Sequence, residues 1–318
     1  MESDSALSVV QTRMKRFTSS KKVKDILKNY ELYLFLVPLA LYYFLFQYVP
    51  MYGVQIAFKN FIAMKGIAGS PWVGFQHFDR FFHSYQFWTI LKNTLSIGLY
   101  ELALFPIPII AAVLLNQVIH SRFKRFVQTV TYAPHFISVV VFVGILQIFL
   151  SPRNGLVNHL IAGLGFEPIN FLGSIHWFQS VFVWSGLWQN AGWGMIIYLA
   201  ALTGISPELH EAARIDGASK LQAIRHVDIP GILPTVMIML ILQLGNFMSI
   251  GFEKVYLMQN SLNAPSSEII QTYVYKTGLL GAQYSYSAAV GLFNSAINCI
   301  LLVTVNQVVR KVQKVGLW

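Results

Sequence analysis

The feature that most constrains this chain is a series of six long apolar stretches. They lie near residues 31–53, 90–115, 127–150, 177–202, 232–252 and 286–308. A helix of about 20 apolar residues crosses the hydrocarbon core of a bilayer, which is about 30 Å thick. None of the stretches alternates apolar and polar residues as a membrane β-strand does. The sequence therefore predicts an all-α integral membrane protein with six transmembrane helices.

The composition agrees with a membrane location. Hydrophobic residues make up 55% of the 318 residues and charged residues only 11%, whereas a soluble domain carries about 25% charged residues. The apolar excess must therefore face lipid. The first apolar stretch is too long for a signal peptide and has no small-residue cleavage site, so we expect it to remain as the first membrane helix.

The distribution of Lys and Arg predicts which side each loop occupies, because loops rich in these residues stay in the cytoplasm. With a cytoplasmic N-terminus, 16 of the 23 Lys and Arg residues fall on the inner side, and Lys254 is one of six on the outer side. Both termini and the loop 204–231 are then cytoplasmic. The predicted parts are a tail over 1–29, a transmembrane domain over 30–310 and a tail over 311–318. The net charge of +10 fits this topology and contact with anionic lipid headgroups rather than nucleic-acid binding.

The chain lacks the residue patterns of an enzyme. It has no Ser/His/Asp or His-x-x-x-His arrangement and no Gly-x-x-x-x-Gly-Lys-Ser/Thr loop for binding nucleotide phosphates. Its single cysteine, Cys299, lies in the sixth apolar stretch and has no partner for a disulfide or a cysteine metal cluster. We therefore expect no catalytic, cofactor-binding or metal-binding residue in this chain.

The cytoplasmic loop between the fourth and fifth stretches carries the signals of a helical hairpin. Ser206 is a good helix N-cap, and Pro207 suits the first position of a helix that we expect to run to Asp216. Gly217 then supplies a turn in which a side chain is costly. We expect a second short helix over Ser219–His226, which Pro230 ends.

The side chains of this hairpin are suited to contact a partner. Ala212 and Ala213 leave one face with little bulk, so another protein can approach closely. Glu211 and Asp216 offer carboxylates to basic groups of that partner. An amphipathic cytoplasmic hairpin without a partner is the alternative interpretation.

The spacing within the loop is specific. Glu-Ala-Ala at 211–213 is followed after three residues by Gly217, and after nine more by an aliphatic-x-aliphatic-Pro ending at Pro230. This pattern resembles the EAA loop of ABC-importer permeases, with Val227 and Ile229 in place of the usual isoleucine and leucine. The resemblance implies that an ATPase subunit is coupled through Glu211, Ala212, Ala213, Asp216, Gly217 and Pro230.

Further similarity extends over nearly the whole chain after residue 29. It includes the segments 48–59, 72–75, 255–258, 286–294 and 316–318. These segments resemble the maltose-type permeases of ABC importers, in the branch that takes up large polysaccharides such as alginate.

This resemblance implies a permease subunit that forms half of a translocation path for oligo- or polysaccharides and works by alternating access. The implied partners are a second permease, usually a different chain, two subunits that hold ATP and Mg, and an extracytoplasmic solute-binding protein. The implied location is the bacterial cytoplasmic (inner) membrane. A non-sugar cargo stays open. The other alternative is a stand-alone ion- or proton-coupled transporter, for which the sequence offers only Glu101, with no complementary buried base evident and no internal repeat.

The family's spacing also predicts a substrate path in the helices that flank the loop. Counting from Glu211 leads to Gln189, Asn190, Trp193, Gln243, Asn246 and Phe247. Uncharged amides in a membrane core are paired or face a water-filled path, and aromatic rings stack on sugars. Bridging of neighbouring helices is the alternative role. Asn294 and Asn298 are weaker candidates for the path.

Several other residues are expected to shape the fold rather than to bind a substrate or partner. We expect Pro106, Pro108 and Pro134 to kink helices. His135 could line the path, but we expect it to be a packing residue. Short outer helices are expected within 151–176 and over 267–278, the latter capped by Ser267. They would either form a docking rim for a binding protein or cover the outer end of the bundle.

Overall fold

The computed structural model describes residues 28–313 and 316, so most of the predicted tails and of the segment 316–318 lies outside the described residues. Within that described part, regular structure is helical apart from one isolated bridge between Lys59 and Trp72. The all-α class is thereby confirmed for these residues. The chain divides into two compact units, one of residues up to 56 with 62–70 and the other of 57–61 with 71 onwards.

The first unit is dominated by one long apolar helical segment. It consists of α3 (Tyr30–Tyr43), η1 (Phe44–Tyr48), α4 (Val49–Met51) and η2 (Tyr52–Phe58), of which the last two residues belong to the second unit. The segment Tyr30–Phe58 is long and apolar enough to cross a membrane, and none of its most apolar part is buried. It matches the first predicted span. Two short elements, η3 (Ala63–Lys65) and α5 (Gly66–Gly69), follow it.

The second predicted span is a helix that is interrupted in its middle. After α6 (Gln76–Phe82), α7 (Phe87–Ala103) ends at a turn, and α8 (Pro106–Asn116) continues. Together α7 and α8 form a candidate span over Phe87–Asn116. Pro106 begins α8, where its missing N–H would have no helical partner in any case. The sequence predicted a kink at this proline, and the structure shows an interruption of the helix directly before it.

The third predicted span is not a straight helix. α9 (Ser121–Tyr132) and η4 (Ala133–Phe136) are bent by 101° relative to α10 (Val139–Phe149). Ile137 and Ser138 between them have extended backbone, and the Ser138 hydroxyl accepts a hydrogen bond from the Val141 N–H at the start of α10. The prediction of one continuous helix over 127–150 was therefore wrong, because a new N-cap starts a second helix.

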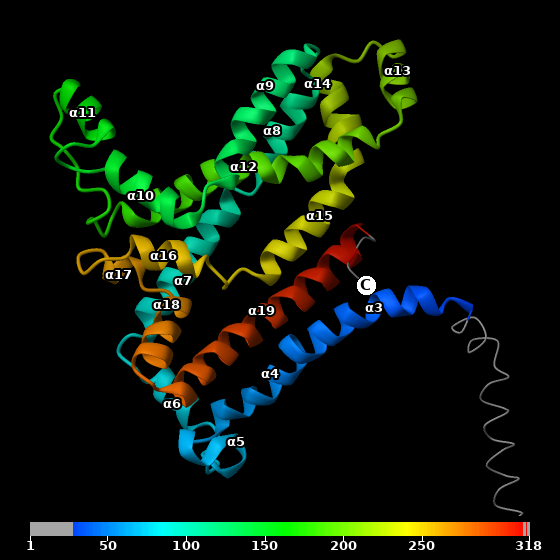
Figure 1. The fold of residues 1–318 in the computed structure, drawn as a ribbon. Helices are drawn as coiled ribbons and strands as arrows, with labels where there is room; N and C mark the ends of the chain where they lie inside the picture. The colour runs from blue at the N-terminus through cyan, green and yellow to red at the C-terminus, as the bar shows by residue number, and fades with distance from the viewer. Residues whose placement is uncertain (1–27, 314–315, 317–318) are drawn as a thin grey trace, which may run out of the picture. The chain divides into compact units, whose positions relative to one another are not determined.

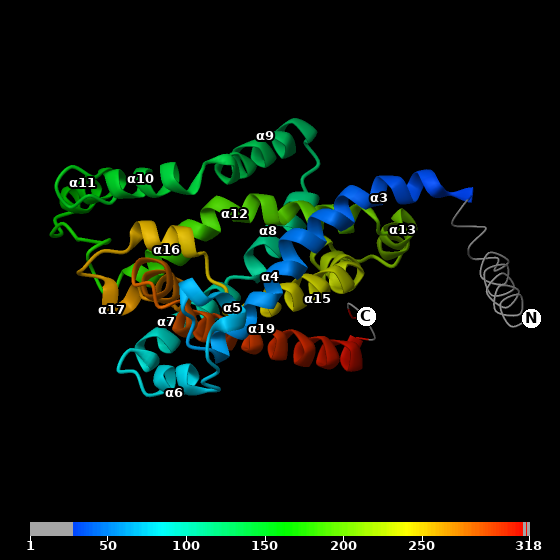
Figure 2. The same cartoon turned by 60° about the horizontal axis from the view of Figure 1, so that its bottom comes forward.

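The next long helix, α12, lies beside the bent pair. α11 (Leu156–Gly163) comes first and confirms a short helix within 151–176. α12 (Phe178–Thr203) then runs unbroken for 26 residues. It contacts α8, α9 and α15, and Figure 2 shows it alongside the bend between α9 and α10.

The predicted hairpin is followed by a longer helix than the sequence predicted. α13 (Pro207–Ile215) is followed by α14 (Lys220–Ala223), η5 (Ile224–Asp228) and α15 (Ile229–Gly245), and the last three form one continuous span over Lys220–Gly245. Pro230 therefore does not end the second hairpin helix, and the expectation that it would was wrong. In the widened π-turn the Ile229 N–H bonds to the Ile224 carbonyl, which lets the chain pass the proline while remaining helical.

The C-terminal part forms short helices and one long one. α16 (Phe252–Met258) is separate from α15, so the fifth span ends at Gly245 and not at 252. After it come α17 (Ala264–Ser267), α18 (Ile270–Tyr275), η6 (Lys276–Leu280) and α19 (Tyr284–Gln313).

The helix predicted over 267–278 does not start where the sequence indicated. Ser267 is the last residue of α17, and its hydroxyl donates to the Asn263 side chain. The helix starts at Ile270 instead, where the Thr272 hydroxyl accepts from the Ile269 N–H. The prediction of Ser267 as the cap was wrong, because a buried asparagine already holds its side chain.

Close helix packing depends on glycines at two crossings. A Cβ atom on Gly192 in α12 would lie 2.0 Å from the Thr131 carbonyl oxygen of α9. A Cβ atom on Gly98 in α7 would lie 2.9 Å from the Phe247 carbonyl oxygen. Real Cβ atoms do not approach so closely, so larger residues at these positions would force the helices apart.

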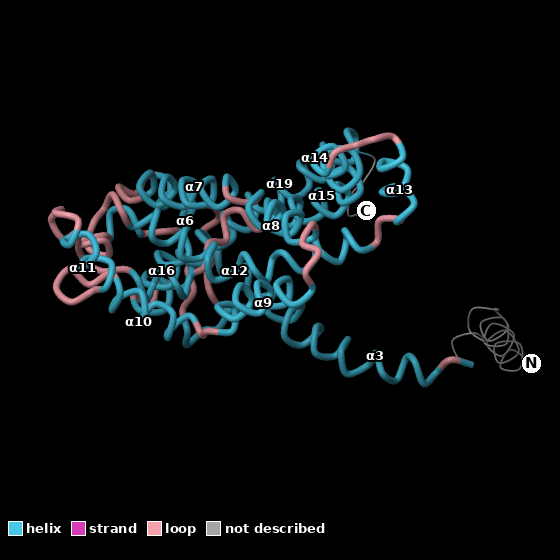
Figure 3. The backbone as a smooth tube through the Cα atoms, turned by 90° about the horizontal axis from the view of Figure 1, so that it is seen from above, coloured by secondary structure: helices cyan, strands magenta, loops and turns pink. Residues whose placement is uncertain are grey.

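By length and apolar composition, the described residues contain four helices that could cross a membrane, or five if α9 and α10 count as one span. α12 does not meet the same apolar criterion, because Gln189 and Asn190 interrupt its apolar surface. Figures 1 and 3 show α13 and α14 at one end of the second unit and α11 at the opposite end.

Candidate functional site

The first helix of the hairpin is closed at both ends by its own residues. The Ser206 hydroxyl accepts from the Glu208 N–H at 3.3 Å, and Pro207 takes the first helical position, as predicted. At the other end the Gly217 N–H donates to the Arg214 carbonyl and the Ala218 N–H to the Ala213 carbonyl. This is a Schellman motif. Its left-handed residue is Gly217, with φ +74°, so the predicted turn is confirmed.

The second helix begins with a reciprocal cap. The Ser219 hydroxyl accepts from the Gln222 N–H at 3.4 Å, and the Ser219 N–H donates to the Gln222 side-chain oxygen at 2.7 Å. A capping box next to a Schellman motif leaves the connection between the two helices little freedom. The hairpin is therefore a defined surface.

A buried carboxylate ties the base of the hairpin to the membrane helices. Asp228 is fully buried. One of its oxygens lies 2.8 Å from His210 Nε2 in α13, and the other accepts from Gln117 Nε2 at 2.7 Å, just after α8. The sequence analysis did not identify these three residues as a unit. The available signal was a carboxylate set among apolar residues directly before the fifth span.

A groove runs along the inner side of the hairpin. Its volume is about 410 Å³, and its walls include Ala212, Ala213, Asp216 and Gly217. These are four of the six residues predicted to contact an ATPase; Glu211 and Pro230 are not part of the wall. Leu209 in the groove wall is 55% exposed, and two further apolar residues of the hairpin, Ile215 and Leu221, are 86% and 74% exposed. An exposed apolar surface of this kind is typical of a protein contact site.

A second cavity lies between the long helices, among α7, α8, α12 and α15. Its volume is about 490 Å³. Three of the predicted path residues line it together: Asn190 from α12, and Gln243 and Asn246 from the end of α15. Glu101 from α7 lies in the same wall. We call this space the amide cavity.

The other predicted path residues do not line the amide cavity. Gln189 is buried and donates to the Ile137 carbonyl at 3.0 Å, so it bridges α12 to the bend before α10. Phe247 packs against Gly98 in an apolar cluster. Trp193 is stacked on His135, with ring centroids 4.6 Å apart.

His135 connects Trp193 to the amide cavity. Its Nδ1 lies 3.0 Å from the Asn190 side-chain oxygen, while the Asn190 amide N–H donates to the Gly186 carbonyl. His135 therefore has a polar partner as well as a packing role. Trp193 and His135 lie next to the cavity wall without forming part of it.

The structure supplies a buried base near Glu101, which the sequence did not reveal. Lys254 in α16 is only 8% exposed, and its ammonium donates to the Phe182 carbonyl at 2.8 Å. The ammonium lies close to Gly186, which lines the amide cavity together with Glu101. The expectation that Glu101 has no complementary base was therefore wrong, because α16 folds back on α12 from a distant part of the sequence.

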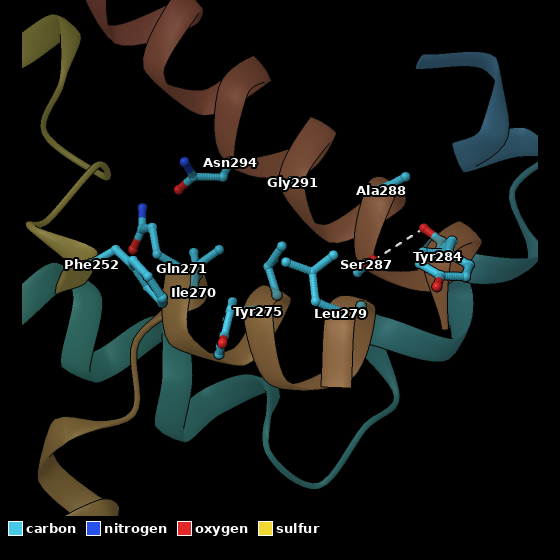
Figure 4. Close-up of a pocket in the computed structure, with 12 residues that line it drawn as sticks. Phe252, Ile270, Gln271, Tyr275, Leu279, Tyr284, Ser287, Ala288, Gly291 and Asn294 are labelled. Carbon is cyan, nitrogen blue, oxygen red and sulfur yellow. Dashed lines mark hydrogen bonds between the residues drawn. The ribbon is translucent and has the colours of Figure 1, made fainter. Parts of the chain in front are cut away.

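A larger cavity of about 580 Å³ lies between α18 and α19. Figure 4 shows the side chains of Gln271 and Asn294 facing the same space, which is otherwise mostly apolar. The buried side-chain oxygens of both residues have no hydrogen-bond partner. Asn298, one turn further along α19, accepts from the Met248 N–H at 2.9 Å and thus bridges two segments. Neither asparagine lines the amide cavity.

A helical membrane protein with an amide-bearing cavity between its long helices and a hairpin with exposed apolar residues fits a transport permease. Residues 105–314 match the family described as the inner membrane component of binding-protein-dependent transport systems. The chain belongs to this family.

Individual relatives support the assignment over almost the full length. The polygalacturonan/rhamnogalacturonan transport system permease protein YteP of Bacillus subtilis (strain 168) is 44% identical over 93% of this chain and 92% of its own length. A chain in the crystal structure of a bacterial alginate ABC transporter, in complex with an alginate pentasaccharide-bound periplasmic protein, is 37% identical. It superposes with a TM-score of 0.85 over 92% of this chain and 99% of its own. A second structure, of a bacterial ABC transporter that imports the acidic polysaccharide alginate, is 36% identical, covers 92% of this chain and 100% of its own, and has a TM-score of 0.86.

Proposed function

We propose that this chain is the permease subunit of an ATP-driven importer for acidic oligo- or polysaccharides. The proposal rests on two sites that lie in the same unit, the hairpin groove and the amide cavity. One continuous helical segment, α14 with η5 and α15, contributes residues to both sites. The relatives named above transport polymers of sugar acids, galacturonan and alginate, which supports a similar cargo.

The proposed topology has six spans. It counts the four apolar helices, the bent pair of α9 with α10, and α12. Burial of α12 against α8, α9 and α15 allows it to carry polar residues in a membrane, because those residues then face protein or the cavity. Both termini and α13 would lie in the cytoplasm of a bacterial cell, with the chain in the inner membrane.

The hairpin is the proposed docking surface for an ATP-binding subunit. The groove is lined by small residues and the carboxylate of Asp216, and Glu211 belongs to the same hairpin helix, α13. This shape fits an inserted apolar side chain flanked by basic groups. The nucleotide and Mg would bind to that partner subunit, and this chain would hold no cofactor or metal and have no catalytic residue.

The amide cavity is the proposed part of the sugar path. Asn190, Gln243 and Asn246 have both donors and acceptors, which suit the hydroxyl groups of a saccharide. A second permease, of a different sequence, would complete the path, and a solute-binding protein would deliver the sugar at the outer end. Alternating access would expose the cavity to each side in turn.

Reconstitution tests the function. The chain, its cognate second permease and ATPase subunits are placed in proteoliposomes, and the uptake of a labelled uronate oligosaccharide is measured with loaded binding protein outside and ATP inside. We expect uptake only when ATP and binding protein are both present. Uptake driven by an ion gradient without the ATPase subunits would favour the stand-alone transporter instead.

A further inference from the structure

Lys254 is a buried lysine with few partners. It lies in α16 and is 8% exposed. Its ammonium makes one hydrogen bond, to the Phe182 carbonyl at 2.8 Å, and lies 4.7 Å and 5.3 Å from the ring centroids of Phe182 and Phe142. An ammonium group has three N–H donors, so most of its hydrogen-bonding capacity is unused here.

The ammonium also lacks a close counter-ion. Among the described residues, the ion pairs within 4.0 Å involve His83, His210 and Lys276 as the basic partners, and Lys254 is in none of them. Glu101 acts on it only from a greater distance. Buried charges in proteins are normally paired, because burial without a partner is costly. Burial accordingly lowers the pKa of Lys254 to about 7, and an anion beside the side chain would stabilise its charged form.

The ammonium lies directly behind the wall of the amide cavity. A Cβ atom on Gly186 would stand 3.1 Å from Lys254 Nζ. Gly186 itself lines the cavity, together with Asn190 and Glu101. The wall has no side chain at the point where the ammonium approaches it, and a lysine side chain is long and flexible.

We propose that Lys254 is a specificity-determining residue of the sugar path, which recognises the carboxylate of a uronate unit across the gap at Gly186. This inference rests on the proposed function and attributes the selectivity for acidic cargo to one residue. The carboxylate supplies the acceptors that the ammonium lacks, and the amides of Asn190 and Gln243 bind the hydroxyl groups.

The arrangement gives a physical reason for the cavity to discriminate against neutral sugars. A neutral unit brings no counter-ion to the buried ammonium, whereas a uronate does. A site built around an unpaired polar group rejects ligands that leave this group unpaired. A purely structural Lys254 would instead support charged and neutral cargo equally.

The test compares uronate oligosaccharides with their methyl esters, which have the same rings but no charge. Uptake is measured in the reconstituted complex at saturating, sugar-loaded binding protein, after calorimetry has established that both ligands load it. In the wild-type complex we expect uronates to be taken up faster than esters. Lys254→Gln should lower the uptake of the charged ligand about tenfold or more and leave that of the ester unchanged.

Two further variants separate recognition from folding. Gly186→Ala keeps the lysine but closes the gap, and we expect the same selective loss. Lys92→Gln removes another lysine, in α7, and should leave the ratio of the two uptake rates unchanged. Equal loss for charged and neutral ligands, or no change in Lys254→Gln, would overturn the role of Lys254. If the wild-type complex takes up neither saccharide, it is the proposed function that fails.

Discussion

His210 Nε2 and Asp228 Oδ1 lie 2.8 Å apart, and this contact joins the first helix of the hairpin to the turn that begins the fifth span. Because Asp228 also accepts from Gln117, a displacement of α13 acts on the end of α8 and on the start of α15 at once. Both helices line the amide cavity. A push on the hairpin is thereby connected to the cavity by hydrogen bonds and continuous helix.

Removing the shared carboxylate should uncouple the two sites. Asp228→Leu leaves the half-buried His210 and Gln117 without their common acceptor. A fully buried polar group left unpaired costs about 1–3 kcal/mol, so the loss here should be at the lower end of that range or below it. We expect a lower midpoint of thermal unfolding in detergent and fewer sugar molecules imported per ATP hydrolysed. The exposed Asp79→Leu is the control, since Asp79 lies in α6, away from the hairpin. An unchanged sugar-to-ATP ratio in Asp228→Leu would show that the contact transmits nothing.

The Gly217 turn provides a second test. At φ +74° any side chain strains the backbone, by about 1–2 kcal/mol. Gly217→Ala should therefore loosen the turn and weaken retention of the ATPase subunit during purification. Gly163→Ala is matched to it, because a Cβ atom on Gly163 would meet no other atom within 4 Å and its φ is not positive. Equal retention of the ATPase by both variants would contradict the role of the turn.

The amide cavity is tested by removing its amides without changing their size much. Asn190→Leu combined with Asn246→Leu should reduce the stimulation of ATP hydrolysis by loaded binding protein, while the ATPase subunit stays bound. Asn294→Leu replaces an amide of α19 outside the cavity. We expect it to leave the stimulation as in wild type. The path assignment fails if the double variant responds normally, or if Asn294→Leu has the larger effect.

The close crossing of α12 with α9 requires a glycine at position 192. Gly192→Ala would place a Cβ atom 2.0 Å from the Thr131 carbonyl oxygen, whereas Gly194→Ala would bring its Cβ no closer than 3.5 Å to Pro108. We expect Gly192→Ala to lower the yield of folded protein after detergent extraction and Gly194→Ala to fold normally, as judged by gel filtration. Normal folding of both variants would mean that the two helices can separate at little cost.

The sequence predicted those features that local chemistry determines. The apolar stretches located the long helices, Ser206 and Pro207 located the start of α13, and Gly217 located its end. The spacing typical of the family predicted that Asn190 and Asn246 belong to one path. Both line the amide cavity, because α12 and α15 contact each other.

The features that the sequence did not predict depend on contacts between distant segments or on unusual helix geometry. Pro230 continues a helix because a π-turn precedes it, and Ser267 is held by Asn263 rather than capping a helix. The hydrogen-bond partner of Lys254 lies 72 residues away along the chain. No local pattern reveals that a lysine predicted for an outer loop folds back against α12.

The most direct test of the central claim, that an ATPase drives this permease through the hairpin, is a charge reversal at Glu211. Uptake of the oligosaccharide and co-purification of the ATPase subunit are measured for Glu211→Lys and for Glu208→Lys, two exposed carboxylates of the same helix. We predict that Glu211→Lys inserts in the membrane but loses both uptake and the ATPase, while Glu208→Lys keeps most of each. Wild-type uptake with a normally bound ATPase in Glu211→Lys would contradict the account.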